Sequence, residues 1–197
     1  GLSETAPAAS IDPIDGKSFS DAIGLPLPST EMSIQNDGGQ ILPVGDEGEI
    51  CIRGPQVMRG YWNNEEDTKK VLTKDGWFKS GDIGIMREDG FFKIVDRKKD
   101  MIIVSGFNVY PSDIEEIAMK HEKVFEAGCI GVKGENDQEV VKLFVSLNEG
   151  VTLTKEEMTK YCRENLTAYK VPKLLEIVDE IPKSNVGKIL RRELREK

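Results

Sequence analysis

Apolar and polar residues alternate with a period of two through the first half of the chain, a pattern typical of half-buried β-strands. Glycine-containing turn sequences, Asn36-Asp37-Gly38-Gly39 and Arg87-Glu88-Asp89-Gly90, separate the alternating runs. The second turn lies between two short runs and therefore predicts a β-hairpin. The predicted strands of this half cover residues 31–35, 48–53, 82–86 and 91–95.

Four helices are predicted, three of them with clear start signals. The first follows Asn64, with acidic residues in its first turn and lysines after them, the charge order that the helix dipole favours. The second opens at Pro111, where a missing N–H is harmless. The third begins at Thr154, which forms a capping box with Glu157. A last helix is predicted over residues 188–195.

The second half of the chain places strand-like runs between these helices. The runs cover residues 101–109, interrupted by Ser105-Gly106, and then 127–132, 140–147 and 174–178. Interleaved strands and helices in a segment of this size predict a small α+β domain. The fold class expected for the whole chain is therefore α+β, with a β-rich part followed by a small α+β domain.

Five consecutive charged residues, Asp96-Arg97-Lys98-Lys99-Asp100, separate the two halves. This segment has no apolar side chain to bury, so an exposed connector is expected here. The sequence predicts a domain boundary at this point, with residues 1–96 in one domain and residues 101–197 in the other.

Composition excludes several classes of protein. With 38% hydrophobic and 31% charged residues, the 197-residue chain has enough apolar material for a core. No apolar run approaches the roughly 18 residues that cross a bilayer, and no signal peptide is visible. The three cysteines are far apart, which favours neither a disulfide framework nor a zinc site and indicates a reducing, cytosolic setting. The chain starts at Gly1 without Met, so we expect it to be a piece of something longer.

The net charge of −8 is confined to one half of the chain. Residues 1–96 carry 17 acidic and 9 basic side chains, whereas residues 97–197 carry 18 of each. The segment 183–197 holds six Lys or Arg against two Glu, which fits either a solvated helix end or a surface that meets nucleotide or coenzyme phosphates. Nucleic acid is not expected as a partner, because the chain is acidic and no aromatic residues interleave with this run.

The common catalytic templates are absent. His121 is the single histidine, and its place at the end of a predicted helix fits a cation near the helix C-terminus. Gly187-Lys188 is not part of a P-loop, because Pro182 and Ile189 stand where that motif needs Gly and Ser or Thr. Short segments of polar residues and glycine remain. Taken singly, each of these islands is an ordinary turn, but together they are compatible with a nucleotide site. They cover residues 1–5, 79–82, 96–100, 105–106 and 182–188.

Four of these islands carry recognisable motifs in a fixed order. They read Gly1-Leu2-Ser3-Glu4, Phe78-Lys79-Ser80-Gly81-Asp82, Asp96-Arg97-Lys98-Lys99-Asp100 and Pro182-Lys183-Ser184-Asn185-Val186-Gly187-Lys188. Together they resemble the motifs of the adenylate-forming superfamily of acyl-CoA synthetases, adenylation domains and luciferases. Residues 75–99 are similar to the fatty acyl-CoA synthetase signature, and residues 106–111 and 170–173 are most similar to bacterial long-chain fatty acid–CoA ligases.

The resemblance implies an activity and a domain organisation. A fatty acid would react with ATP to give acyl-adenylate and pyrophosphate, and CoA would then displace AMP. Residues 1–96 would be the C-terminal, β-rich part of a large adenylation domain, residues 97–100 a hinge, and residues 101–197 the small mobile C-terminal domain.

The resemblance also assigns roles to single residues. Lys188 would be catalytic, stabilising charge that develops during adenylation. Ser3, Asp82 and Arg97 would bind ATP or AMP, with Asp82 accepting both ribose hydroxyls. Glu4 would bind Mg²⁺, which offsets the repulsion between carboxylate and triphosphate. The remaining roles concern the second half-reaction: Lys99 at the hinge, and Ser105 and Gly106 at the CoA pantetheine.

The resemblance implies partners as well. The expected partners are a fatty acid, ATP and CoA, with Mg²⁺ as the metal ion. The expected location is the cytoplasm, where peripheral contact with the inner face of the membrane is possible. A homodimer formed through the region upstream of Gly1 is also possible. Ile103 stands where many relatives carry Lys, so it has no expected polar role. Because the Gly-rich phosphate loop and most of the adenine and acyl pockets are not in this sequence, we expect the 197 residues alone to be inactive.

Two alternatives stay open. An acyl-AMP ligase or carrier-loading adenylation domain would share the ATP motifs but use another acceptor. A non-catalytic interaction module would keep the motifs only as turns.

Overall fold

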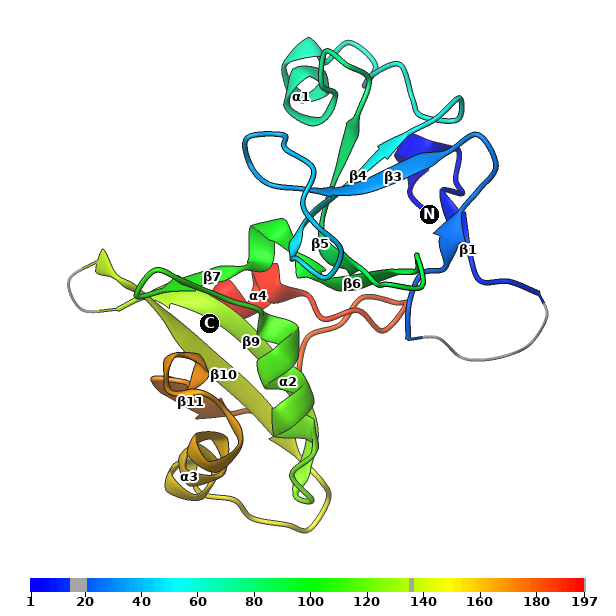
Figure 1. Cartoon of the computed structure of the whole chain (residues 1–197). Helices are drawn as coiled ribbons and strands as arrows, with labels where there is room; N and C mark the ends of the chain where they lie inside the picture. Colours follow the sequence, from blue (N-terminus) through cyan, green and yellow to red (C-terminus); the bar gives the residue numbers. More distant parts are fainter. Residues whose placement is uncertain (15–20, 135–136, 197) are drawn as a thin grey trace. The chain divides into compact units, whose positions relative to one another are not determined.

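The structure is a computed structural model that describes residues 1–14, 21–134 and 137–196. The chain divides into two compact units, Gly1–Lys99 and Asp100–Lys197, each with its own sheet and apolar core (Figure 1). The described part is rich in strands and also carries helices, so the predicted α+β class is confirmed. That residues 1–96 belong to a larger adenylation domain stays a prediction.

The first unit is built on a four-stranded antiparallel sheet in the order β3-β4-β5-β6. Each strand overlaps a predicted run, although β5 begins four residues earlier than predicted and β6 is shifted by one to two residues. β5 and β6 form the predicted hairpin with Gly90 at its turn. The bounds in this unit are β1 (Ser10–Ile11), β2 (Leu25–Pro26), β3 (Glu31–Gln35), β4 (Gly48–Arg53), β5 (Phe78–Met86) and β6 (Phe92–Arg97), with the 3-10 turn η1 (Ser3–Thr5).

Buried side chains of this sheet form the core of the first unit. They include Ile34, Ile50, Ile52, Phe78 and Phe92, each no more than 2% exposed. Burying a side chain of this kind contributes about 1.5–3 kcal/mol. This core fixes β5 and β6, which carry two of the predicted site residues.

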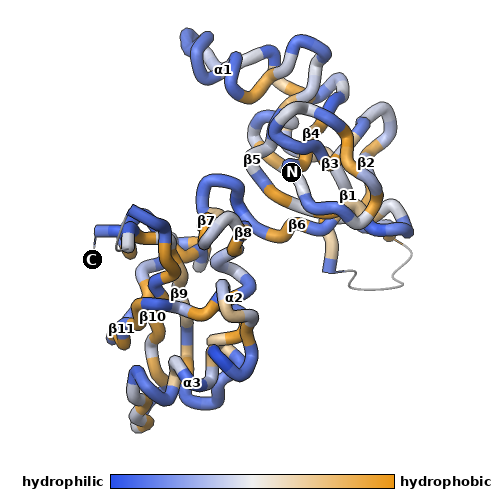
Figure 2. Tube along the Cα trace, turned by 60° about the vertical axis from the view of Figure 1, so that its left-hand side comes forward, coloured by the Kyte–Doolittle hydropathy of each residue, from blue (hydrophilic) through white to orange (hydrophobic). Residues whose placement is uncertain are grey.

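The helix α1 (Glu65–Val71) of the first unit is stabilised by an N-cap and by ion pairs between its own side chains. The Asn64 side chain accepts a hydrogen bond from the Asp67 N–H, the contact of an N-cap. Lys69 pairs with Glu65 one turn earlier. No residue of this helix is buried, and Figure 2 shows it as a largely hydrophilic segment. The predicted helix is confirmed.

The second unit contains a three-stranded sheet in the order β11-β10-β9 and a separate hairpin. β9 and β10 are antiparallel, whereas β11 is parallel to β10 and follows it through the helix α3. The bounds are β7 (Ile102–Val104), β8 (Phe107–Val109), β9 (Val124–Lys133), β10 (Glu139–Leu147) and β11 (Leu174–Ile177), with the helices α2 (Pro111–Met119), α3 (Lys155–Asn165) and α4 (Arg191–Arg195) and the turn η4 (Ala168–Lys170). The turn η2 (Lys98–Asp100) spans the boundary between the two units.

Helices cover both faces of this sheet. Cys129 and Leu143 lie in one core with residues of α2 and α3, while their strand neighbours Ile130 and Phe144 lie in another with Leu194 of α4. Successive strand residues point to opposite faces, so the two cores are on opposite sides of β9 and β10. Figure 2 shows hydrophobic stretches along these strands. The α4 side of the sheet supports the C-terminal loop.

The predicted helix over residues 188–195 is too long. The observed α4 begins at Arg191, and Lys188 lies in the loop before it. Gly187 has a φ of 78°, which does not continue a right-handed helix, and Lys183 pairs with Ile189 in an antiparallel bridge. The turn therefore ends just before the helix starts.

The exposed connector expected at residues 96–100 is also wrong in part. Arg97 is the last residue of β6, while Asp96 and Asp100 are each only 7% exposed. Charged side chains are buried when partners satisfy them, and two arginines far along the sequence do this for Asp100. Local composition could not reveal those partners.

None of the helices in the described part of the chain is long and apolar enough to cross a membrane.

Candidate functional site

Asp82 sits in a bulge of β5. Along β4, Glu49 pairs with Ile83 and Cys51 pairs with Lys79, so three residues of β5 lie opposite the one residue between them on β4. A bulge of this kind re-aims side chains without breaking the sheet. Gly81 has a φ of 74°, and a Cβ on it would meet nothing within 4 Å. The bulge therefore gives Asp82 a fixed position next to an open stretch of backbone.

Arg97 pairs with Asp82 across the β5–β6 ladder. Its Nε atom lies 2.7 Å from Oδ1 of Asp82. The Asp82 side chain is 10% exposed and the Arg97 side chain 50%. Thus the carboxylate is fixed and largely buried, while the guanidinium reaches it from the surface. The structure brings together these two predicted ribose-binding residues.

A second ionic cluster holds the backbone of the bulge. Glu49 accepts a hydrogen bond from the Gly81 N–H at Oε1 (3.1 Å) and another from Lys98 Nζ at Oε2 (2.8 Å). Lys98 also donates to Asp37 at 2.7 Å. Burial opposes the charge of Lys98, but the hydrogen bonds to Asp37 and Glu49 outweigh it and raise the pKa of Lys98. The hydrogen bond from Lys98 in turn lowers the pKa of Asp37.

Ser3 and Glu4 lie on η1 of the first unit. Ser3 is exposed, and Oε1 of Glu4 accepts a hydrogen bond from the Tyr61 hydroxyl at 3.0 Å. Partial burial, and then this hydrogen bond, raise the pKa of the Tyr61 phenol. Met58 donates its N–H to the Glu4 carbonyl, which ties η1 to the segment after β4.

Glu4 fits a magnesium site that is completed by substrate phosphates, and not a site built from protein ligands alone. Within the described ranges no three acidic, His or Cys side chains gather into a metal cage. Mg²⁺, however, is usually held by one or two carboxylates together with substrate phosphates and water. A partly exposed carboxylate such as that of Glu4 fits an ion that arrives with a triphosphate.

Ser105 and Gly106 form the two-residue turn of the β7–β8 hairpin. Both have positive φ, 51° and 84°, as a type I′ turn requires. Both are exposed, and a Cβ on Gly106 would meet nothing within 4 Å of its own unit. Next to the turn, the Phe107 ring stacks on Tyr169 at 4.6 Å. The structure thus places the predicted CoA residues on a projecting, backbone-exposed turn.

Lys188 lies on a tight loop, residues 182–188, which we call the lysine loop. Hydrogen bonds close it: the Ser184 N–H donates to the Lys188 carbonyl and the Gly187 N–H to the Ser184 carbonyl, both at 2.8 Å. Lys188 is exposed, and its ammonium has no hydrogen-bond or ion-pair partner among the residues that the structure describes. The predicted catalytic lysine is therefore carried on an ordered loop and projects from it.

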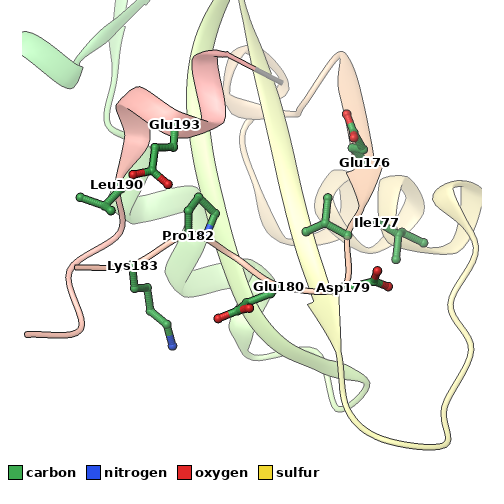
Figure 3. Close-up of a pocket in the computed structure, with 9 residues that line it drawn as sticks. Glu176, Ile177, Asp179, Glu180, Pro182, Lys183, Leu190 and Glu193 are labelled. Carbon is green, nitrogen blue, oxygen red and sulfur yellow. The ribbon is translucent and has the colours of Figure 1, made fainter. Parts of the chain in front are cut away.

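The base of the lysine loop borders a pocket and is held by a hydrogen bond and an ion pair. Pro182 and Lys183 line a pocket of about 880 Å³ with Leu190 and Glu193 of the segment that follows the loop (Figure 3). The Leu190 N–H donates to the Pro182 carbonyl at 2.8 Å, and Lys183 forms an ion pair with Glu126. Only the end of the loop that carries Lys188 lies outside these contacts.

The predicted residues are distributed over both units. Ser3, Glu4, Asp82, Arg97 and Lys99 belong to the first unit, and Ser105, Gly106 and Lys188 to the second. Lys99 is exposed and forms no ion pair or hydrogen bond with the described residues.

Sequence reasoning missed several residues that build these sites. Glu49 and Lys98 hold the bulge, and Glu115 and Arg191 form a buried ionic cluster with Asp100, which the more exposed Arg195 also contacts. A signal did exist for Glu115, which lies three residues before Ala118 and thus on the packed side of its helix.

Comparison with known proteins identifies the family. The model described as "AMP-binding enzyme" matches residues 1–62, and the one described as "AMP-binding enzyme C-terminal domain" matches residues 113–188. The chain belongs to the AMP-binding, adenylate-forming enzymes. The chain is 55% identical over 196 residues to a long-chain-fatty-acid–CoA ligase of Yersinia pestis, a match that covers all of the chain and 34% of that ligase.

Solved structures agree with this family. ATP-bound MatB from Rhodopseudomonas palustris aligns with a TM-score of 0.93 at 34% identity, covering all of this chain and 39% of the other. The o-succinylbenzoate–CoA synthetase MenE from Bacillus subtilis, in complex with its acyl-adenylate intermediate, aligns with a TM-score of 0.85 at 33% identity, covering 99% of this chain and 40% of the other. The chain spans about a third of the length of the curated relatives it matches.

Proposed function

We propose that these 197 residues act as the C-terminal part of an ATP-dependent long-chain fatty acid–CoA ligase. The observation that carries the proposal is the match along the whole chain to ligases of that name, at 55% identity in one case. The exposed ammonium of Lys188 and the ion pair of Asp82 with Arg97 support it, because adenylation needs a mobile positive charge and a fixed acceptor for ribose.

The first half-reaction joins the fatty carboxylate to AMP. A carboxylate oxygen attacks the α-phosphorus of ATP, and pyrophosphate leaves with the electron pair of the broken P–O bond. Lys188 would approach the carboxylate and the bridging oxygen, where charge develops, and stabilise the transition state. Asp82 would accept hydrogen bonds from the ribose hydroxyls, and Arg97 would be a second ribose contact.

Residues of η1 would act at the triphosphate end. Ser3 would donate a hydrogen bond to phosphate, and Glu4 would help to hold Mg²⁺ brought by ATP. When bound, the ion offsets the negative charge that keeps a carboxylate away from a triphosphate. Tyr61 orients the Glu4 carboxylate through its hydroxyl.

The second half-reaction transfers the acyl group to CoA. The CoA thiol attacks the acyl carbon, AMP leaves, and the thiol proton is lost to solvent. Ser105 and Gly106 would line the path of the pantetheine arm, where an exposed turn lets a ligand approach the backbone. Lys99 would be the point about which the small domain turns between the half-reactions.

The location of this activity follows from its substrates. All three cysteines are free and buried, which fits the reducing cytoplasm where ATP and CoA are available. A long-chain acid partitions into membranes, so peripheral contact with the inner face would bring the enzyme to its substrate. We also propose a homodimer that forms through the region upstream of Gly1.

The experiment uses a ligase that contains these residues in their full-length context. We expect ATP–pyrophosphate exchange that depends on a long-chain fatty acid, followed by loss of one free CoA thiol per acyl group. Exchange without CoA consumption would instead favour the acyl-AMP ligase or carrier-loading alternative. If no exchange occurs at all, the result would favour the alternative of a non-catalytic interaction module. The 197 residues alone should not catalyse exchange, and activity near that of a complete ligase would contradict this expectation.

A further inference from the structure

The first residue of the second unit is held by the last helix. Asp100 is 7% exposed, and its Oδ1 lies 2.9 Å from Arg195 Nη2 while its Oδ2 lies 3.7 Å from Arg191 Nη1. The arginines are four residues apart on α4, so they project from the same face of the helix. Asp100 is thereby held by the first and the last residue of α4.

These contacts continue into the interior of the unit. Arg191 Nη2 lies 2.8 Å from Glu115 of α2, and Glu115 accepts a second hydrogen bond from the Cys129 N–H of β9 at 2.8 Å. Glu115 is 6% exposed. Buried carboxylates of this kind are costly unless they are paired and hydrogen-bonded, so the position of each member depends on the others.

The lysine loop is followed almost immediately by Arg191, a member of this ionic cluster. Only Ile189 and Leu190 separate Lys188 from Arg191. Ile189 packs against the core that contains Leu194, and Leu190 is hydrogen-bonded to Pro182 at the other side of the loop. A short, packed path therefore connects Lys188 to Asp100, although 88 positions separate them in sequence.

We propose that Arg191 and Arg195 are positioning residues that fix the lysine loop to Asp100. Asp100 directly follows Lys99, the residue proposed as the hinge. When the backbone dihedrals of Lys99 change, Lys188 then moves together with Asp100. The lysine loop keeps its position within the second unit during this rotation. This inference rests on the proposed function, because it gives the arginines an effect on catalysis only through Lys188.

The test variant is Arg195→Ala in the full-length ligase, since Arg195 is partly exposed and, among the residues that the structure describes, forms an ion pair with Asp100 alone. The matched control is Arg192→Ala, which removes the same side chain from the same helix at an exposed position with no partner among the described residues. We expect Arg195→Ala to slow adenylation by about 10- to 100-fold, the range caused by small misplacement of a catalytic group. Arg192→Ala should change it less than about twofold, in keeping with a surface substitution.

Two further measurements separate positioning from general destabilisation. Thioester formation from supplied acyl-adenylate should be retained in Arg195→Ala, since that step does not use Lys188. Arg195→Lys should recover most of the adenylation rate, because the contact with Asp100 uses a single nitrogen.

A double-mutant cycle with Lys188→Ala gives the decisive result. If Arg195 acts only through Lys188, then Arg195→Ala should have no further effect on adenylation in the Lys188→Ala background. Additive losses, or equal losses in both half-reactions, overturn the inference. If Lys188→Ala alone leaves adenylation unchanged, the proposed function fails instead.

Discussion

Arg97 and Asp82 form an ion pair across neighbouring strands, with 2.7 Å between Nε and Oδ1. The two residues were assigned to the same ribose, and the fold of the first unit alone is enough to join them. The bulge in β5 and the end of β6 set this distance, so the fold of the first unit fixes the position of the proposed ribose acceptor.

The carboxylate of Asp82 should therefore control nucleotide affinity in the full-length ligase. Asp82→Asn keeps the size of the side chain but removes its charge. Hydrogen bonds that involve a charged group contribute about 1.5–3 kcal/mol, so we expect Kd for AMP to rise by roughly 10- to 100-fold. Asp46→Asn, at an exposed position of the same unit, is the control and should leave Kd unchanged. An unaltered Kd in Asp82→Asn, measured by calorimetry, would contradict the ribose role.

Lys188 should be needed in one half-reaction only. Lys188→Ala should lower adenylation by about 10²–10³-fold, the effect of removing one preorganised transition-state donor. Thioester formation from supplied acyl-adenylate should remain, which stopped-flow measurement of each step would show. Lys155→Ala, at the exposed start of α3, is the matched control. Equal loss in both steps would count against a loop that moves between them.

Gly106 and Gly150 offer a matched pair for the CoA path. Both have positive φ, 84° and 76°, and a Cβ on either would meet nothing within 4 Å. Substitution of each by Ala should cost a similar amount of stability, about 1 kcal/mol for the left-handed backbone. Only Gly106→Ala should in addition slow thioester formation and raise KM for CoA. If the two variants have the same kinetics, the pantetheine assignment is wrong.

Lys98 should stabilise the first unit through its contact with Glu49. Lys98→Ala leaves the Glu49 carboxylate, with an 8% exposed side chain, without this donor, a loss of about 1–3 kcal/mol. Lys69→Ala removes an exposed i,i+4 pair with Glu65 and should cost less than about 0.5 kcal/mol. Urea denaturation of both variants provides the comparison. Equal effects would mean that the Lys98 cluster contributes no more than a surface pair.

Two buried thiols predict a loss of stability in alkaline solution. Burial raises the pKa of Cys51 to about 12 and that of Cys162 to about 11, against about 8.5 in an unfolded chain. Between these values the unfolded state releases protons that the folded state keeps, so the free energy of unfolding falls as pH rises. The contribution is fully present below about pH 8.5 and is lost through about pH 11–12. Urea denaturation at pH 8 and pH 9.5, where most tyrosine and lysine side chains are still protonated, should show the decline.

A double variant supplies the control for the thiol prediction. In Cys51→Ala with Cys162→Ala, the decline between pH 8 and pH 9.5 should be smaller than in the unaltered chain. An equal decline in both proteins would assign it to other groups.

The sequence predicted those elements whose signals are local. The alternating pattern of β3 and β4, the capping box at Thr154 and the proline at the start of α2 all act within a few residues, and each marks an observed element. These forces do not depend on the rest of the fold. The β-hairpin at Gly90 was predictable for the same reason.

The two errors have different causes. Asp100 was predicted to be exposed because its neighbours are charged, yet it is paired with Arg191 and Arg195, which lie 91 and 95 positions away and outside any short window of sequence. The helix predicted from residue 188 begins at Arg191 because a local backbone bridge between Lys183 and Ile189 closes the loop first. The composition of residues 188–195 does not reveal that bridge. The site residues themselves were found only through the ordered motifs, since each motif alone is an ordinary turn.

Lys98 and Asp100 are both tied down, one to Glu49 in the first unit and the other to α4 in the second, and a single residue lies between them. Two residues of extended chain span at most about 7 Å, so these two attachment points stay within that reach in every arrangement of the protein. Such a short connection permits rotation of the second unit about Lys99 and prevents translation of one unit along the other. An insertion of a few flexible residues after Lys99 would lengthen this connection, and the second unit would then sample many orientations instead of the two proposed for the half-reactions.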